Sequence, residues 1–273
     1  MDYSSSKQIK IQATSLEGSS RAGKTTLLQK IGKELGGQIG IIPEGSEYIG
    51  RDENDVVFDM STVEGAKESL FFCLEVEKER TKDIMLMAQK GIPIIMDRSL
   101  WSILIFYNTL AKVEPAFDRH FEEFYPYVLA VFEAVVKNGS VLMPSKIVYM
   151  TVENENVFQS RLGGKSHNKF LGEWKNVLTY ERLYPKLVLS HYSVGDILEV
   201  HSNNRADDLE KLVTQVSGFI STNRERPIEL ASILQNPAHS LKYSAADLAC
   251  DNERYKKIRE FALFLIKKQK NHN

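Results

Sequence analysis

Eight consecutive residues near the start of the chain match G-x-x-x-x-G-K-[ST], a pattern typical of loops that bind polyphosphates. They are Gly18, Ser19, Ser20, Arg21, Ala22, Gly23, Lys24 and Thr25. The glycines let backbone N–H groups curl around an anion, and the following helix points its positive end at the same anion. We expect Lys24 to reach the outer phosphates, the hydroxyl of Thr25 to bind Mg²⁺, and Thr26 to complete a nucleoside triphosphate site.

The elements around this loop agree with that interpretation. Residues 8–16 read as an apolar strand and residues 24–35 as a helix, which is the context that a phosphate loop requires. The chain contains neither D-x-x-G nor [NT]-K-x-D, which argues against a switch protein that reads guanine.

Acidic and basic side chains follow two further strands, at residues 38–43 and 92–96. Ligands of open α/β sheets collect at the carboxyl ends of the strands. Asp97 is expected to organise Mg²⁺, and Arg98 to hold a phosphoryl group or the acceptor. Glu44 is expected to accept the proton of an attacking hydroxyl or to hold an acceptor sugar. A second acid near the donor phosphates implies a bound acceptor, so a kinase is favoured over a simple hydrolase.

Two arginines are candidates for stabilising the transferring phosphoryl group. Negative charge spreads over its equatorial oxygens, and a basic lid that closes over them excludes water. Arg161 begins such a basic stretch, RLGGKSHNK, and Arg21 lies in the phosphate loop itself. The predicted catalytic residues are therefore Lys24, Glu44, Asp97, Arg98, Arg161 and Arg21, with Thr25 and Asp97 as magnesium ligands.

Short β-branched runs alternate with long helical patterns, which predicts an α/β fold with a parallel sheet covered by helices. Pro126 is expected to kink or split one helix. Further strands are expected at residues 146–152 and 197–200, and further helices at residues 64–89, 100–111, 114–137, 173–190 and 207–220. We expect a first domain at residues 1–221, followed by a linker and a helical C-terminal extension at residues 222–273.

The composition excludes several other classes of protein. A formal net charge of −1 gives no bulk reason to bind a nucleic acid polymer or an anionic membrane. Cys73 and Cys250 are the only cysteines, so a disulfide framework is excluded. No apolar run approaches the roughly 20 residues of a membrane span, and the amino end lacks the apolar core of a signal peptide. We therefore expect a cytoplasmic protein.

Several segments, in the same order, resemble the thymidylate kinase and deoxynucleoside kinase superfamily over roughly residues 8–220. They include EGSSRAGKTT, IIPEGSEYIG and AQKGIPIIMDRSLWSILIFYN. The resemblance implies a three-layer P-loop kinase fold with five parallel strands, and ATP with Mg²⁺ as the phosphoryl donor. It implies the roles already given for Lys24, Thr25, Glu44, Asp97 and Arg98. Because family members often dimerise through helices, it also implies a homodimer.

The acceptor side departs from both branches of this superfamily. Thymidylate kinases usually have an arginine just before the Pro-Glu pair to hold the acceptor's phosphate, whereas this chain has Ile41 and Ile42. Nucleoside kinases usually read the base with an Asp and a Gln, and the matching positions are Ile103 and Cys73.

Four hypotheses about the function follow. The leading one is a kinase that transfers the γ-phosphoryl group of ATP to a nucleoside hydroxyl. The first alternative is a kinase of thymidylate or another nucleoside monophosphate. A kinase of another hydroxyl compound and a non-catalytic nucleotide-binding subunit are further alternatives.

Overall fold

The computed structural model describes residues 11–49, 58–162, 173–189, 192, 194–202 and 206–222, and the single residues 260, 264 and 271. In this part of the chain five parallel strands form one sheet with the order β2-β3-β1-β4-β5. The strands are β1 (Ala13–Gly18), β2 (Gly40–Ile42), β3 (Ile94–Asp97), β4 (Lys146–Val152) and β5 (Ile197–Ser202). The predicted α/β fold with a five-stranded parallel sheet is confirmed.

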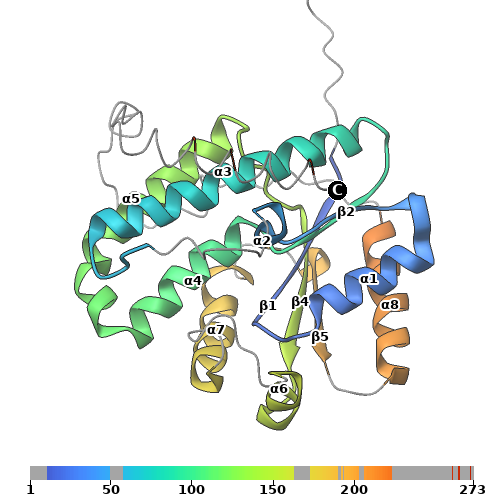
Figure 1. Ribbon diagram of the computed structural model, residues 1–273. Helices are drawn as coiled ribbons and strands as arrows, with labels where there is room; N and C mark the ends of the chain where they lie inside the picture. Colours follow the sequence, from blue (N-terminus) through green and yellow to red (C-terminus); the bar gives the residue numbers. More distant parts are fainter. Residues whose placement is uncertain are drawn as a thin grey trace, which may run out of the picture.

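Two layers of helices cover this sheet (Figure 1). On one face, α1 and α8 pack on Leu16, Val148 and other apolar residues of the strands. On the other face, α3, α4, α5 and α7 enclose a larger core that includes Ile147 and Tyr149 of β4. The helices are α1 (Lys24–Leu35), α2 (Gly45–Tyr48), α3 (Val63–Ala88), α4 (Leu100–Val113), α5 (Pro115–Lys137), α6 (Glu155–Leu162), α7 (Trp174–Leu187) and α8 (Ala206–Ser221).

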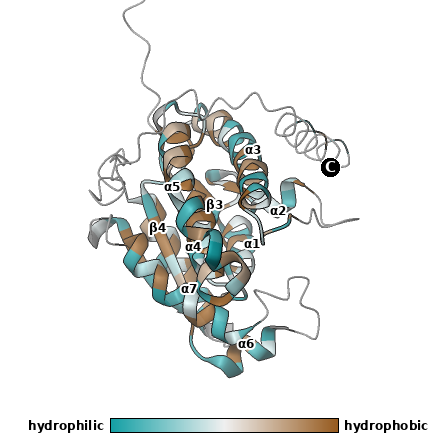
Figure 2. Cartoon of the chain, turned by 90° about the vertical axis from the view of Figure 1, so that its left-hand side faces the viewer, coloured by the Kyte–Doolittle hydropathy of each residue, from teal (hydrophilic) through white to brown (hydrophobic). Residues whose placement is uncertain are grey.

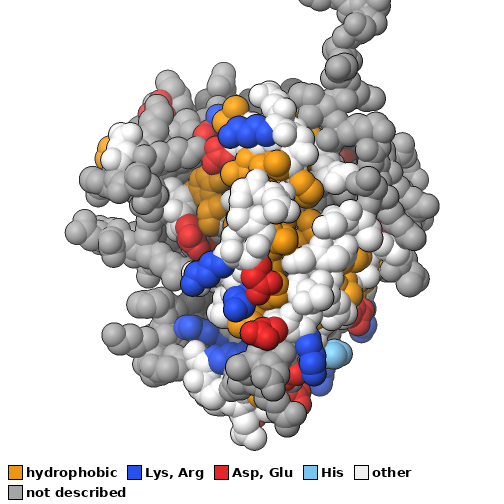
Figure 3. All heavy atoms as spheres, turned by 90° about the vertical axis from the view of Figure 1, so that its right-hand side faces the viewer, with side chains coloured by type: hydrophobic (Ala, Val, Ile, Leu, Met, Phe, Trp, Pro, Cys, Tyr) orange, Lys and Arg blue, Asp and Glu red, His pale blue; other side chains and the backbone are white. Residues whose placement is uncertain are grey.

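The outer surfaces of both layers are mixed in character. In Figure 2 hydrophilic and hydrophobic residues share the surfaces of α3 and α4, as expected for helices that bury only one side. On the opposite face of the molecule, the visible acidic and basic side chains lie next to one another (Figure 3). Among the described helices, none is both long and apolar enough to cross a membrane.

The structure contradicts one of the two expectations for Pro126, that it splits the helix. This residue lies inside α5, which continues from Pro115 to Lys137, so the proline does not split the helix. Phe124 and Val128, on either side of it, are fully buried in the same core. Packing of this face therefore holds the helix together where one backbone hydrogen bond is lost.

Boundaries elsewhere move by only a few residues. The predicted helices at residues 24–35, 64–89 and 207–220 are α1, α3 and α8. The end of the first domain at residue 221 stays a prediction. The predicted extension at residues 222–273 lies outside the described residues, apart from residues 222, 260, 264 and 271, and stays a prediction.

Gly18 joins β1 to the phosphate loop in a conformation that other residues avoid. Its φ is +142°, and a Cβ atom built on it would lie 2.0 Å from the carbonyl oxygen of Met150 in β4.

We expect Gly18→Ala to lower the free energy of unfolding by at least about 2 kcal/mol, because the backbone strain and the clash with Met150 add to each other. Urea unfolding would measure this change. Gly37→Ala is the control, since its added Cβ meets nothing within 4 Å; equal losses in both variants would contradict the prediction.

Candidate active site

The phosphate loop connects β1 to α1 and closes around the ammonium group of Lys24. Lys24 Nζ donates to the carbonyl oxygens of Ser19, at 2.8 Å, and Gly18, at 3.1 Å. The N-cap residue of α1 is Gly23, with φ +94°, which has no side chain to cap the first turn. The N–H groups of this turn are therefore suited to bind an anion, as predicted from the sequence.

Asp97 lies at the end of β3, beside the loop. Its Oδ2 accepts a hydrogen bond from Thr25 Oγ1 at 3.0 Å. The side chain is 1% exposed, and its Oδ1 is buried without a hydrogen-bond partner among the described residues. A buried carboxylate oxygen with no partner is costly, and a hard cation would satisfy it. Thr25 and Asp97 thus fit the predicted Mg²⁺ site.

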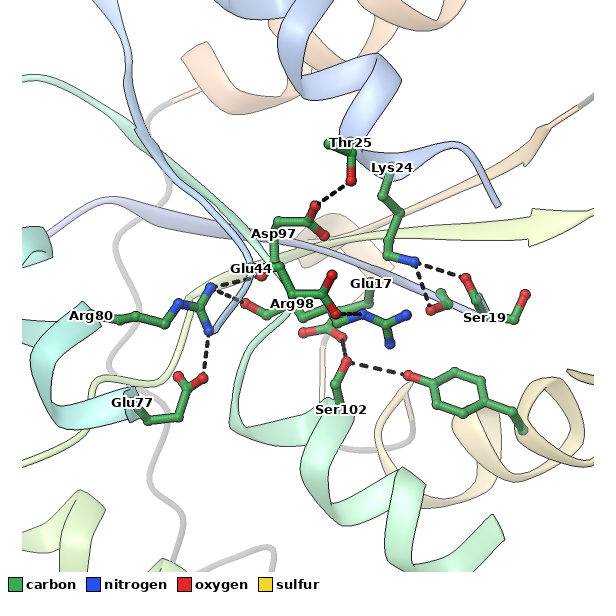
Figure 4. A network of polar contacts seen from close by, with 12 residues as sticks. Glu17, Ser19, Lys24, Thr25, Glu44, Glu77, Arg80, Asp97, Arg98 and Ser102 are labelled. Atoms are coloured by element: carbon green, nitrogen blue, oxygen red, sulfur yellow. Dashed lines mark hydrogen bonds and ion pairs between the residues drawn. The ribbon is translucent and has the colours of Figure 1, made fainter. Parts of the chain in front are cut away.

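Arg98 and Glu44 form an ion pair next to these residues (Figure 4). The Nε atom of Arg98 lies 2.8 Å from Oε1 of Glu44, which lies between β2 and α2. Burial alone would lower the pKa of Arg98, but the carboxylates around it, Glu44 first, raise its pKa above the ordinary value. Arg98 is therefore a permanent cation at the point where the carboxyl ends of β2 and β3 meet.

Arg161 reaches the loop from α6. Its Nη1 donates to the carbonyl oxygen of Arg21 at 2.9 Å, and burial lowers the pKa of Arg161. Arg21 adopts the left-handed conformation, with φ +64°. The guanidinium of Arg161 thus contacts the backbone of the loop at Arg21.

The remaining loop residues differ in environment. Ser19 is 1% exposed, and its hydroxyl donates to Oε1 of Glu181 in α7 at 2.8 Å, which ties the loop to that helix. Burial raises the pKa of Glu181. Ala22 is fully buried, whereas Thr26 is exposed in the first turn of α1.

Glu17 is a buried residue of the site to which our sequence analysis gave no role. It is fully buried just before the loop and accepts hydrogen bonds from the hydroxyls of Ser99, at 2.5 Å, and Ser102. Ser102 Oγ also lies 3.3 Å from the hydroxyl of Tyr180. Burial raises the pKa of Glu17, although the two serines and Arg98 act in the opposite direction. Glu17 thereby ties the N-terminus of α4 to β1.

Arg80 and Glu77 of α3 are two further buried residues that sequence reasoning missed. Arg80 donates to the carbonyl oxygens of Asp97, at 2.7 Å, and Arg98, at 2.9 Å, and pairs with Glu77. The sequence did contain a signal for these residues. Glu77 and Arg80 are oppositely charged and three residues apart, on the face of the helix that carries the core residue Leu70.

Comparison with known proteins identifies a family and solved structures that are similar to the chain. The profile of the thymidylate kinase family matches residues 16–182. The structure of thymidylate kinase from Candida albicans is 13% identical, with 78% of this chain and 92% of that chain covered and a TM-score of 0.49. No curated protein matches the chain.

Lys24 gives the site a testable pH dependence. Its pKa is lowered to about 8, first by burial and then by Arg98. Only the protonated form attracts a polyphosphate, so we expect the affinity for ATP to fall as the pH rises through about 8, by up to about tenfold per pH unit.

Calorimetric titrations with ATP between pH 6.5 and 9.5 would measure this fall. Lys33→Met, at an exposed position in the last turn of α1, should keep the pH dependence, whereas Lys24→Met should bind weakly and lose it. A wild-type dissociation constant that stays constant over this range would show that Lys24 does not bind the phosphates.

Proposed function

The chain belongs to the thymidylate kinase family, and from this premise we propose that it transfers the γ-phosphoryl group of ATP to the phosphate of a nucleoside monophosphate. The observation that carries the proposal is the convergence of Lys24, Asp97 and Arg98 at the carboxyl edge of the sheet. The family match favours this acceptor, the first alternative from the sequence, over the nucleoside hydroxyl that we placed first.

The donor side of the proposed site consists of the phosphate loop, Thr25 and Asp97. Lys24 and the N–H groups at the start of α1 would hold the β- and γ-phosphates of ATP. Thr25 Oγ1 and the unpartnered Oδ1 of Asp97 would hold Mg²⁺, which neutralises developing charge between these phosphates. Arg161, whose guanidinium donates to the backbone carbonyl oxygen of Arg21, and Arg21 itself would stabilise the transferring group.

The acceptor side is built around Arg98. Its guanidinium can bind the acceptor's phosphate, and an oxygen of that phosphate then attacks the γ-phosphorus. A new P–O bond forms as the bond from the γ-phosphorus to its bridging oxygen breaks, and ADP leaves. The attacking oxygen carries no proton when the acceptor's phosphate is a dianion, so this reaction needs no general base. Glu44 would then orient Arg98 or hold the sugar.

The second candidate acceptor is a nucleoside hydroxyl, and one observation favours it. Ile42 precedes the Pro43-Glu44 pair and is fully buried in an apolar cluster, so this position offers no cation for the acceptor's phosphate. A hydroxyl must lose its proton during the attack, and the carboxylate of Glu44 can accept it.

A direct assay decides between the two acceptors. Purified protein with ATP and Mg²⁺ should release ADP when a nucleoside monophosphate such as thymidylate is added. The nucleoside diphosphate formed from that acceptor should accumulate in the same amount as ADP. Each common nucleoside, tested separately, should give much slower release. Stimulation by nucleosides alone would overturn the proposal in favour of the second candidate, and binding of ATP without turnover by any acceptor would point to a non-catalytic subunit.

Glu44→Gln provides an independent test of the chemistry. With a monophosphate acceptor we expect a change in kcat of less than about tenfold, accompanied by a higher KM for the acceptor, because no proton is transferred. A loss in kcat of about 10²- to 10⁴-fold would instead identify Glu44 as a general base. In both cases the dissociation constant of ATP should stay close to that of the wild type. Glu47→Gln, at an exposed position in α2, is the matched control.

A further inference from the structure

We propose that Arg80, together with Glu77, positions the turn that carries Asp97 and Arg98 for phosphoryl transfer; this role rests on the proposed function of that turn. Arg80 lies in the middle of α3, and its side chain is 1% exposed. Its guanidinium donates hydrogen bonds to the backbone of the turn, and not to the side-chain carboxylate of Asp97. Arg80 is therefore a positioning residue and not a catalytic one.

The contacts of Arg80 match the shape of the turn. Its Nη2 donates to two consecutive carbonyl oxygens, those of Asp97 and Arg98, at 2.7 and 2.9 Å. Consecutive carbonyls of an extended strand point to opposite sides, so a single nitrogen reaches both only where the chain turns between them. Arg98 makes this turn with φ +63°, a conformation unfavourable for a residue with a side chain. The two hydrogen bonds from Arg80 compensate for that conformation.

The charge of Arg80 is balanced within the same helix. Its Nη1 lies 2.5 Å from Oε1 of Glu77, and the Glu77 side chain is also buried. Burial alone would lower the pKa of Arg80, but Glu77 raises it above the ordinary value. Arg80 therefore stays charged in the interior, where its hydrogen bonds to carbonyl oxygens are strongest.

Helix α3 also contacts α2, the short helix that begins after Glu44 of the Arg98–Glu44 ion pair. Glu44 leads into α2, and Tyr48 at the end of α2 donates its hydroxyl to Oδ2 of Asp83 in α3 at 2.7 Å. The same helix, α3, thus contacts the segments on both sides of the ion pair, through Arg80 and through Asp83 (Figure 4 shows the contacts of Arg80).

The consequence concerns the two site residues that extend from this turn. The backbone of Asp97 sets where its free carboxylate oxygen points, and the backbone of Arg98 sets the reach of its guanidinium. Displacement of reacting groups by about 1 Å can slow a reaction about 100-fold. Loss of the Arg80 contacts should therefore weaken both the use of Mg²⁺ and the binding of the acceptor, while the phosphate loop keeps its own geometry.

The test compares Arg80→Lys with the double variant Glu77→Met/Arg80→Met in the full-length chain. The double variant removes both buried charges, a change that proteins often tolerate, so it should fold. We expect its kcat to fall at least about tenfold. Its dissociation constant for ATP in EDTA should stay within about twofold of the wild type, whereas the gain in ATP affinity on adding Mg²⁺ should be largely lost. Arg80→Lys keeps the positive charge and one donor nitrogen. It should therefore retain part of the kcat and part of the Mg²⁺-dependent gain in ATP affinity.

Lys146→Met is the matched control. Lys146 is also a buried cation, 3% exposed, that donates to backbone carbonyl oxygens, those of Phe219, Ile220 and Thr222. It begins β4, at the end of the sheet away from the phosphate loop (Figure 1). We expect this variant to have a lower Tm and unchanged kcat and Mg²⁺-dependent ATP affinity.

Two results would overturn the proposal. One is a folded double variant whose kcat and Mg²⁺-dependent ATP affinity equal those of the wild type. The other is an equal loss of both properties in Lys146→Met, which would show that any destabilisation has the same effect. If the wild type turned over no acceptor, the proposed function would fail, but the Mg²⁺-dependent affinity for ATP would still test the positioning role of Arg80.

Discussion

The parallel pairing of β1 with β3 is the constraint on which the rest of the site depends. Its register places Leu16 opposite Asp97, so the acid that ends β3 lies beside the start of the phosphate loop. Thr25 then reaches Asp97 from α1, and Glu44 reaches Arg98 from the neighbouring strand. A shift by one residue would turn the Asp97 side chain to the opposite face of the sheet and separate it from the loop.

A second constraint is that the buried charges near the carboxyl ends of β1 and β3 must be balanced. Lys24, Arg80 and Arg98 are cations in or near the interior, and buried carboxylates lie among them. Arg80 and Arg98 each pair with a carboxylate, which limits the cost of desolvation. Lys24 donates to backbone carbonyl oxygens instead, and burial lowers its pKa. Lys24 in the phosphate loop is therefore the cation of this group that a bound anion would stabilise most.

The two sides of the proposed reaction are supported unequally by the fold. The donor side combines a loop and the first turn of the helix that follows it with one long-range contact, from Thr25 to Asp97. The acceptor side rests on an ion pair between Glu44 and Arg98, which come from different strands and are both supported by α3. The loop keeps the family's motif, whereas Ile41 and Ile42 before the Pro-Glu pair depart from the pattern of thymidylate kinases.

Local patterns in the sequence determined the α/β class, the phosphate loop and the acids at the strand ends, because each depends on residues close together along the chain. Strand boundaries were less certain, and the continuity of α5 through Pro126 was decided by packing on both sides of the proline. Only the tertiary structure revealed the contacts of Glu17 and Arg80, whose partners lie 82 and 17 residues away in the sequence. A buried charge acquires its function from the partner that folding brings to it, and no spacing along the chain encodes that partner.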